Sequence, residues 1–355
     1  MDTKQLAFLK ELVEAPSPSG FEEPAAAVLR EHLTGVVDEV ETDVLGSVHG
    51  ILRGKDAAAP SVMLAGHIDE VGLMVSYIMP EGYLSAMMIG GVDSAILPGL
   101  RVDVHTADGP LLGVLGRKPI HLIERDERDK VTKLEKLFID VGLPADEVKA
   151  RVRIGDPVTV HVGLEEFGDD LVVSRALDDK MGAWICARVA EEVKAAGGAA
   201  GDLIVAGTIQ EEIGLRGGQT SAYAANPDIF IAVEVGHATD YPDIDKRSYG
   251  EMIVGKGPSF GRGPNINKEV LRRLEAAATE AGVGYQFNAE PGATGTDANT
   301  AQIARGGIAT ALVSIPNRYM HTPTEVVSLR DLDACVKILT RFVLDLQPGV
   351  ELRPV

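Results

Sequence analysis

The strongest constraint on the fold is an alternation of helix-like segments with short apolar runs, which stops in the middle of the chain and then resumes. After residue 171, segments of helical periodicity alternate with apolar runs such as LIVAGTI, IFIAVEV and IATALVSI. Strands that are separated by helices favour a mostly parallel sheet with helices on both faces. We therefore expect an α/β fold for this part of the chain.

Residues 71–161 have a different texture, in which short β-like pieces alternate with glycine and proline. Turn signals recur at short intervals here, which favours a small β-sandwich or barrel. The charged stretch ERDERDKVTKLEK interrupts the region and is interpreted as a solvated loop or short helix. We predict a discontinuous α/β domain over 1–74 and 164–355, and an inserted all-β domain over 75–163.

Two helices are expected before the first strand. The segment TKQLAFLKELVEA has the apolar spacing of an amphipathic helix, and PSPSG ends it. Ser19 and Glu22 then have the spacing of a capping box, in which each side chain satisfies a backbone N–H at the start of a helix. This spacing predicts a second helix that runs from about Glu22 to Leu33.

Composition and charge exclude several classes of partner. The formal net charge of −19 argues against binding to nucleic acid, which requires a basic face. No apolar run approaches the roughly 18 residues that a membrane span requires, and the N-terminus lacks the pattern of a signal peptide. The two cysteines, Cys186 and Cys335, are interpreted as buried thiols in a reducing compartment. We therefore expect a cytoplasmic protein that binds neither nucleic acid nor membranes.

Charged side chains follow four of the apolar runs, at the point where each expected strand ends. The residues at these four ends are His67, Glu211 with Glu212, Glu234, and His321. Open α/β sheets bind their ligands at the carboxyl ends of the strands. Asp178 and Asp179 precede an expected helix, whose N-terminus favours carboxylates. These positions predict one site that gathers histidines and carboxylates.

Two histidines and several carboxylates at one place form a set of metal ligands, suited to zinc, cobalt or manganese. If one carboxylate bridges two ions, each ion needs one histidine and one further carboxylate. The residues that fill this scheme are His67, His321, Glu212, Glu234 and a bridging Asp178. One glutamate of the adjacent pair is then left over. A carboxylate beside a metal site that is not itself a ligand can take a proton from metal-bound water.

Each of these residues also has an ordinary structural explanation. A histidine at a strand end is commonly structural, two adjacent aspartates commonly cap a helix, and two adjacent glutamates commonly form a solvated pair. Those explanations do not predict that such residues occur together at the ends of separate strands. Asp69 lies two residues after His67, so its side chain can reach the second ring nitrogen of that histidine, unless it caps a turn instead.

Five motifs follow one another along essentially the whole chain. They are AGHIDEVGLMV, GVLGRKPIHL, SRALDDKMG, TIQEEIGLRGG and GTDANTAQIARGGIATALVSIPNRYMHTPTEVV. Together they resemble the co-catalytic metallo-aminopeptidases of the tetrahedral and glutamyl aminopeptidase type, whose relatives are often called endoglucanases. The resemblance implies two divalent ions, usually zinc or cobalt. It implies that Glu211 is the general base and that Asp69 is the supporting acid group. The ligands that it implies, with Asp178 bridging the two ions, are His67, Asp178, Glu212, Glu234 and His321.

The resemblance also implies an assembly, in which the inserted β domain makes dimer contacts and the dimers often build a hollow tetrahedral dodecamer. On this basis we expect an aminopeptidase that releases N-terminal residues from short peptides. Metal-bound hydroxide would attack the scissile carbonyl, and Glu211 would pass the proton to the leaving amine. His237 and Asp240 lie near Glu234 and are interpreted as supporting or structural residues.

Two other functions are kept as alternatives. A deacylase or amidohydrolase would use the same ion pair on non-peptide amides. A protein that binds glycans, in line with the endoglucanase label, would need an aromatic platform for stacking sugars. Trp184 is the only tryptophan of the chain, and it falls in a helix that is expected to be buried.

Overall fold

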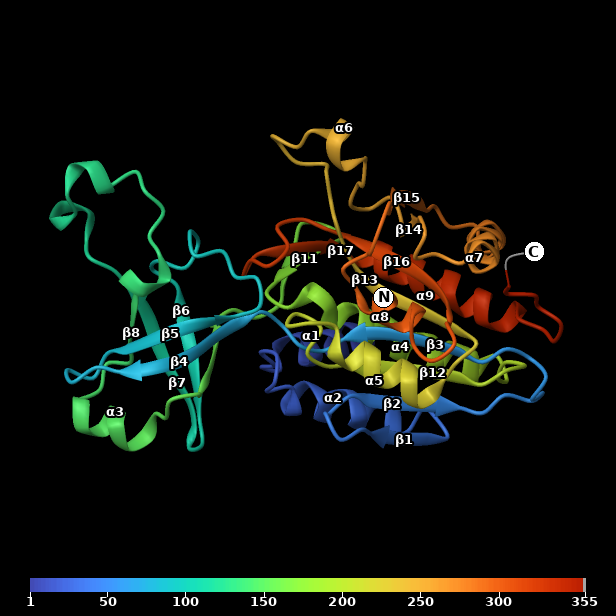
Figure 1. Cartoon of the computed structure of the whole chain (residues 1–355), viewed down its shortest axis with the longest axis horizontal. Coiled ribbons are helices and arrows are strands. Elements are labelled where there is room, and N and C mark those ends of the chain that lie inside the picture. Colours follow the sequence, from blue (N-terminus) through green and yellow to red (C-terminus); the bar gives the residue numbers. More distant parts are fainter. Residues whose placement is uncertain (354–355) are drawn as a thin grey trace.

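An eight-stranded mixed sheet forms the centre of the larger part of the molecule (Figure 1). The computed structural model of the chain describes residues 1–353. The strands, in their order across the sheet, are β1 (Glu39–Thr42), β2 (Val48–Leu52), β12 (Leu203–Thr208), β3 (Val62–His67), β13 (Ile229–His237), β16 (Ala309–Asn317), β14 (Ser259–Arg262) and β15 (Gln286–Ala289).

The predicted α/β class is confirmed, but the sheet is less parallel than expected. The central strands β12, β3, β13 and β16 run parallel to one another. In contrast, β2 is antiparallel to β1 and to β12, and β14 is antiparallel to β16. Strands β3 and β12 are buried along their whole length, as the continuous apolar runs of central parallel strands predict.

Helices cover both faces of this sheet. The helices of the larger part are α1 (Thr3–Glu14), α2 (Glu23–Thr34), α4 (Leu177–Ala195), α5 (Arg216–Ala225), α6 (Lys246–Tyr249), α7 (Lys268–Ala281), α8 (Asp297–Gln302) and α9 (Leu329–Asp345). A Cβ added at Gly66 would lie 2.2 Å from the nitrogen of Ala183, so glycine there lets α4 pack directly on β3. Gly207 faces Leu29 of α2, whereas the next residue, Thr208, donates a hydrogen bond to Asp297 of α8. Successive strand residues point to opposite faces, so α2 and α8 lie on opposite sides.

The predicted capping box at the start of the second helix is wrong. Helix α2 begins at Glu23, and its N-cap residue Glu22 makes no side-chain capping bond. Instead, Ser19 donates a hydrogen bond to Asp69 at 2.6 Å, and Glu22 accepts one from the backbone N–H of Gln210 at 3.1 Å. Ser19 therefore contacts a distant loop of the sheet edge, and Glu22 joins such a loop to the N–H of the nearby Gly20, which donates to it at 2.7 Å.

A closed β-barrel forms the smaller part of the molecule, to one side of the sheet (Figure 1). Its strands, in order around the barrel, are β4 (Gly72–Ile78), β5 (Leu84–Ile89), β8 (Phe138–Asp140), β7 (Gly109–Gly116), β6 (Arg101–Thr106) and β9 (Pro157–Val160). The barrel has its own hydrophobic core, separate from that of the sheet and helices. This separate core is what the change of texture in the sequence predicted.

The inserted segment is not all-β, contrary to expectation. Helix α3 (Ala145–Arg151) lies between β8 and β9, with Asp146 and Glu147 in its first turn and Lys149 near its end, where these charges favour a helix. After β7 the chain forms three short 3₁₀ turns: η1 (Ile120–Leu122) precedes the charged stretch, and η2 (Arg125–Glu127) and η3 (Leu134–Lys136) lie within it. The domain boundaries at residues 75 and 163 stay a prediction.

A three-stranded sheet joins the barrel to the larger part. It is formed by β10 (Glu165–Phe167), β11 (Leu171–Ser174) and β17 (Glu325–Ser328), in that order. Strand β11 leads from the barrel into α4, and β17 follows the loop that carries His321. The two segments that flank Asp178 and His321 are thus paired side by side.

Two expectations from composition can be compared with the structure. Cys186 and Cys335 are both free and buried, which confirms their interpretation as buried thiols. Within residues 1–353, no helix combines the length and the apolar character that crossing a bilayer requires. The cytoplasmic location stays a prediction.

Candidate active site

The predicted site residues meet at one edge of the central sheet. His67 is the last residue of β3, Glu234 lies within β13, and Asp178 lies in the first turn of α4. The adjacent Glu211 and Glu212 follow β12, and His321 follows β16. The carboxyl ends of parallel strands bring these side chains together, as in other open α/β sheets.

Two groups of three possible ligands form at this edge, and they share Asp178. The first group is His67, Asp178 and Glu234, and the second is Asp178, Glu212 and His321; within each group, one ligand atom per residue lies within 4.8 Å of the others. The Nε2 atom of His67 lies 3.7 Å from Oε2 of Glu234. The Nε2 atom of His321 lies 3.2 Å from Oε1 of Glu212.

The two carboxylate oxygens of Asp178 face different groups. Its Oδ1 lies 3.1 Å from Nε2 of His67, and its Oδ2 lies 3.2 Å from Nε2 of His321. A carboxylate in this position can bind one ion through each oxygen. The peptide bond between Asp178 and Asp179 is cis.

The adjacent glutamates occupy different places. Glu212 belongs to the second ligand group, whereas Glu211 belongs to neither. The Oε2 atom of Glu211 lies 4.0 Å from Nε2 of His67, at the margin of the first group. Burial raises the pKa of Glu211 to about 8. The charge of His67 opposes this shift, whereas Asp297 and other carboxylates add to it. A carboxylate that lies beside the ligand groups and belongs to neither of them can serve as a general base.

The donor set fits divalent cations. Burial and neighbouring carboxylates raise the pKa of Glu234 well above its usual value, and its Oε1 is buried without a hydrogen-bond partner. Hydrogen bonds to Asp178 and Glu212 raise the pKa of His321 to about 11. Each shift has the direction expected of crowded carboxylates that lack compensating positive charge. Two divalent ions, each bound by one imidazole and two carboxylates, would supply that charge.

Asp69 contacts the site in a way that the sequence only partly predicts. The Nδ1 atom of His67 lies 3.0 Å from the backbone carbonyl oxygen of Asp69 and 3.5 Å from its Oδ1, so the closer partner is the carbonyl and not the carboxylate. The carboxylate accepts hydrogen bonds from the backbone N–H groups of Glu211 and Glu212, at 3.0 and 3.2 Å. Asp69 therefore orients His67 through its backbone and fixes the adjacent glutamates through its side chain.

Two buried carboxylates, Glu325 and Asp179, accept hydrogen bonds from the backbone of the predicted ligands; Asp179 is one of the two aspartates predicted at this site, whereas Glu325 was not predicted. Glu325 accepts hydrogen bonds from the backbone N–H groups of Asp178 and His321, at 3.0 and 2.9 Å. Asp179 accepts one from the backbone N–H of His67 at 3.1 Å. Outer partners of this kind set the orientation of metal ligands. The position of Glu325 at the start of a strand just after His321 is the one signal that could have indicated its role.

His321 depends on a segment of the barrel part for its orientation. Its φ of 62° lies in the left-handed region, which non-glycine residues rarely adopt. Its Nδ1 lies 3.1 Å from the carbonyl oxygen of Gly91, in the segment between β5 and β6. The second ligand group therefore includes a side chain that is oriented across the junction between the two parts.

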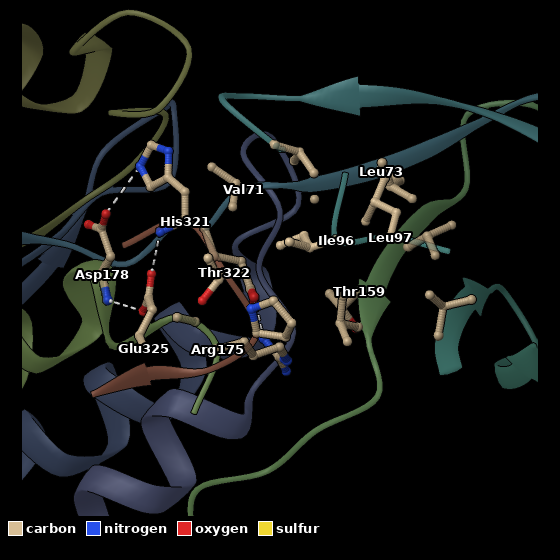
Figure 2. Close-up of a pocket in the computed structure, with 18 of the residues that line it drawn as sticks. Val71, Leu73, Ile96, Leu97, Thr159, Arg175, Asp178, His321, Thr322 and Glu325 are labelled. Carbon is tan, nitrogen blue, oxygen red and sulfur yellow. Dashed lines mark hydrogen bonds and ion pairs between the residues drawn. The ribbon is translucent and has the colours of Figure 1, made fainter. Parts of the chain in front are cut away.

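A small apolar cavity lies at this junction, next to the second ligand group. Figure 2 shows Val71 beside His321 at the end nearest the site, and Leu73, Ile96 and Leu97 farther from it. The cavity holds only about 40 Å³. Of the five predicted ligands, only Asp178, Glu212 and His321 line it.

A larger cleft of about 370 Å³ opens on the other side of the site. All five predicted ligands and Glu211 line it, together with residues of β13, β16 and the segment after β15. His237 also lines this cleft, whereas Asp240 accepts hydrogen bonds from Arg318 at 2.8 and 2.6 Å and makes a structural ion pair. The cleft is the space through which a substrate can reach the ligand groups.

Comparison with known proteins gives matches along nearly the whole chain. Residues 46–338 match the family model of the M42 glutamyl aminopeptidases. The chain is 33% identical over 348 residues to the lysyl aminopeptidase of Pyrococcus furiosus, covering 96% of this chain and 97% of that protein. It superposes with a TM-score of 0.91 on a TET aminopeptidase from Thaumarchaeota archaeon SCGC AB-539-E09, at 32% identity, covering 97% of this chain and 96% of that one. The TET1 peptidase of Pyrococcus horikoshii, which can assemble into a tetrahedron or a large octahedral shell, gives a TM-score of 0.84 at 26% identity, covering 96% and 100%.

Proposed function

The chain belongs to the M42 glutamyl aminopeptidase family and is an aminopeptidase, and from this premise we propose how its residues carry out the reaction. The observation that carries the proposal is the pair of ligand groups that share Asp178 at the floor of an open cleft, with Glu211 beside them and outside both.

In this proposal His67, Asp178 and Glu234 hold one divalent ion, and Asp178, Glu212 and His321 hold the other. Zinc or cobalt bound there would polarise the scissile carbonyl and make a water molecule nucleophilic at neutral pH. In support of a bridging role, the carboxylate of Asp178 lies between the two histidines, with one oxygen toward each ring. Asp69 and Glu325 fix the backbone of the residues around them.

Glu211 is the general base of the proposed reaction. Its carboxylate accepts the proton of the attacking water and then donates it to the nitrogen of the leaving peptide. Its carboxylate is free for both steps, because Glu211 belongs to neither ligand group. The N–H of Glu211 is held by Asp69, so the side chain starts from a fixed backbone position.

The proposed substrates are short peptides with a free N-terminus, from which the enzyme releases the first residue. The test loads the protein with zinc or cobalt and offers amino acid 4-nitroanilides in parallel with N-acyl amino acids. We expect hydrolysis of the anilides, its loss on chelation and its return with either metal. Hydrolysis of the N-acyl amino acids alone would favour the deacylase alternative, and full activity in metal-free protein would contradict the metal sites.

We further propose that the barrel part makes dimer contacts and that the dimers build a tetrahedral dodecamer. The observation in favour is a set of large apolar side chains exposed on the barrel strands. They are Tyr77 on β4, Met87 and Met88 on β5, and Leu112 and Val114 on β7. Burial of such side chains between subunits would remove apolar surface from water.

Light scattering tests this assembly on the intact chain. We expect a mass of many subunits, and a smaller mass for Leu112→Asp, which places a charge on the exposed barrel surface. Val44→Asp is the matched control, because Val44 is fully exposed on a loop of the sheet part and should not affect the mass. A monomer at all concentrations and metal loadings would contradict the proposal.

A further inference from the structure

The loop that carries the adjacent glutamates is held through its backbone N–H groups. Three successive groups, those of Gln210, Glu211 and Glu212, donate to two buried carboxylates. The carboxylate of Glu22 accepts the first at 3.1 Å, and that of Asp69 accepts the other two at 3.0 and 3.2 Å. Gln210 has a φ of 53°, in the left-handed region, where a non-glycine residue stays only if its surroundings hold it. The position of Glu211 therefore depends on what fixes these two carboxylates.

Both carboxylates are contacted by one short segment between α1 and α2, residues 19–22. Ser19 donates a hydrogen bond from Oγ to Oδ2 of Asp69 at 2.6 Å, and the backbone N–H of Gly20 donates to Oε1 of Glu22 at 2.7 Å. The side chain of Glu22 turns away from the start of α2 and toward Gln210, from which 188 residues separate it. A segment near the N-terminus thus reaches the loop of the glutamates by two separate routes.

Ser19 decides which way the carboxylate of Asp69 faces. Oδ1 of Asp69 lies 3.5 Å from Nδ1 of His67, longer than the usual hydrogen-bond distance, and accepts the N–H of Glu211 instead. The bond from Ser19 to Oδ2 has the short length of a hydroxyl that donates to an ionised carboxylate, and such bonds are among the stronger ones. The carboxylate cannot turn toward the imidazole without breaking it. Ser19 therefore keeps Asp69 directed at the glutamate loop.

We propose that Ser19 and Glu22 are positioning residues of the active site, which hold the loop of Glu211 so that its carboxylate stays beside the ligand groups. The inference rests on the proposed role of Glu211 as general base and adds the residues that place it. Both residues lie outside the ligand groups and outside the lining of the cleft. Their contribution therefore belongs to kcat, which depends on where the general base lies, and not to KM or metal content.

The first test is Ser19→Ala, measured in zinc-loaded enzyme with an amino acid 4-nitroanilide. We expect kcat to fall by about tenfold or more, because a displacement of about 1 Å at a catalytic group can cost about 100-fold, while KM and metal content stay the same. Ser221→Ala is the matched control, since Ser221 is a fully buried serine on α5 whose hydroxyl lies 2.8 Å from Nε2 of His49. It removes a buried hydrogen bond elsewhere and should lower the melting temperature without changing kcat. Wild-type kcat in Ser19→Ala would overturn the role of Ser19.

A double-mutant cycle separates positioning from a general structural defect. If Ser19 acts through Glu211, Ser19→Ala should have little further effect on kcat in the Glu211→Gln background. A structural defect would lower the residual kcat by the same factor in both backgrounds, and that result would overturn the proposal. Unchanged turnover in Glu211→Gln alone would instead overturn the general base on which the proposal rests.

Amide hydrogen exchange gives a readout that does not depend on turnover. In the metal-free protein, the N–H groups of Glu211 and Glu212 should exchange faster in Ser19→Ala than in Ser221→Ala, because their acceptor is no longer held in place. Unchanged exchange at both groups would contradict the proposed route from Ser19 through Asp69 to the loop.

Glu22 provides a second test that does not depend on the folding of Ser19→Ala. Both of its hydrogen bonds end on the same oxygen, Oε1, and a glutamine side chain retains such an oxygen. Glu22→Gln should therefore keep kcat near that of the wild type. Glu22→Leu removes the acceptor and should lower kcat by about tenfold with KM and metal content unchanged. Wild-type kcat in Glu22→Leu would overturn the proposal. An equal loss in both variants would also overturn it, because the charge of Glu22 and not its hydrogen bonds would then matter.

Discussion

The two ligand groups share Asp178 but are built in different ways. In the first group, the side chains of His67 and Glu234 are 2% and 4% exposed, and both come from buried strands of the central sheet. In the second group, the side chain of His321 is 33% exposed and comes from a loop in a left-handed backbone conformation. The first group is therefore part of the core, whereas the second takes Glu212 and His321 from loops and is exposed at His321.

The difference also extends to what orients each histidine. His67 contacts the carbonyl of Asp69, two residues away, whereas His321 contacts the carbonyl of Gly91, which belongs to the segment between two barrel strands. A local contact forms whenever the strand end forms, but the Gly91 contact requires that the barrel part be correctly placed. We therefore expect the first position to bind its ion more tightly and to exchange it more slowly than the second.

The largest loss of metal affinity is expected for a change at Asp178, which both ligand groups share. Asp178→Asn removes the charge that both positions share, and a neutral amide is a poor ligand for a borderline cation. We expect both ions to bind more than about 100-fold more weakly, exceeding the 10–100-fold loss typical of an outer partner. Metal analysis after gel filtration should find neither position filled. Retention of one full equivalent would mean that Asp178 does not bridge the two positions.

Glu325→Gln should cause a smaller loss of metal affinity, and the loss should differ between the two metal positions. Each carboxylate oxygen of Glu325 accepts a hydrogen bond from a backbone N–H group. In glutamine one of these oxygens is replaced by an NH₂ group, which would point a donor at one of the two N–H groups. We expect about a 10–100-fold loss of affinity at the second position, which includes both affected residues, and a smaller loss at the first. Competition with a chelator, monitored by cobalt absorption, distinguishes the two.

The exposed Glu166→Gln on β10 serves as the control for Glu325→Gln and should change neither affinity. Equal losses at both positions in Glu325→Gln would show that the two groups respond as one unit. That result would remove the proposed distinction between a core position and a loop position.

The smallest effect is expected for Gly91→Ala. The added Cβ would lie 3.1 Å from Nδ1 of His321, which is tight enough to move the ring or the backbone by a few tenths of an ångström. We expect the second ion to exchange severalfold faster, with the first ion unaffected, because the hydrogen bond to Nδ1 weakens. Gly35→Ala, whose added Cβ has nothing within 4 Å, is the control. Faster exchange of the first ion alone would contradict the assignment of Gly91 to His321.

The sequence predicted the parts of the site that follow from strand periodicity. His67 and Glu234 lie at the ends of apolar runs, and parallel strands of one sheet necessarily bring such ends to one edge. Glu325 could not be found in this way, because it acts on the backbone of Asp178, 147 residues earlier. Ser19 matched a local capping pattern but donates its hydrogen bond to Asp69, 50 residues later. Local patterns thus predicted residues that meet at the site, whereas the residues that orient them depend on tertiary contacts.

The fold, too, was predicted where it depends on local features and not where it depends on tertiary contacts. The change of texture at residues 71–161 predicted a separate β structure, because turn signals and short strands are local features. The antiparallel addition of β14 to β16 and the helix α3 between barrel strands were not predicted. The first depends on how a distant strand enters the sheet, and the second is a helix too short to show a clear period.

The central claim is that the adjacent glutamates have different roles, and one paired measurement tests it most directly. Metal content and kcat are measured side by side for Glu211→Gln and Glu212→Gln. Glu211→Gln should keep both ions and lower kcat by about 10²–10⁴-fold, the contribution of a positioned general base, with no rescue by added metal. Glu212→Gln should lose the second ion and be partly rescued by excess metal. Loss of an ion in Glu211→Gln with both retained in Glu212→Gln would reverse the two roles, and unchanged turnover in both would place the reaction elsewhere.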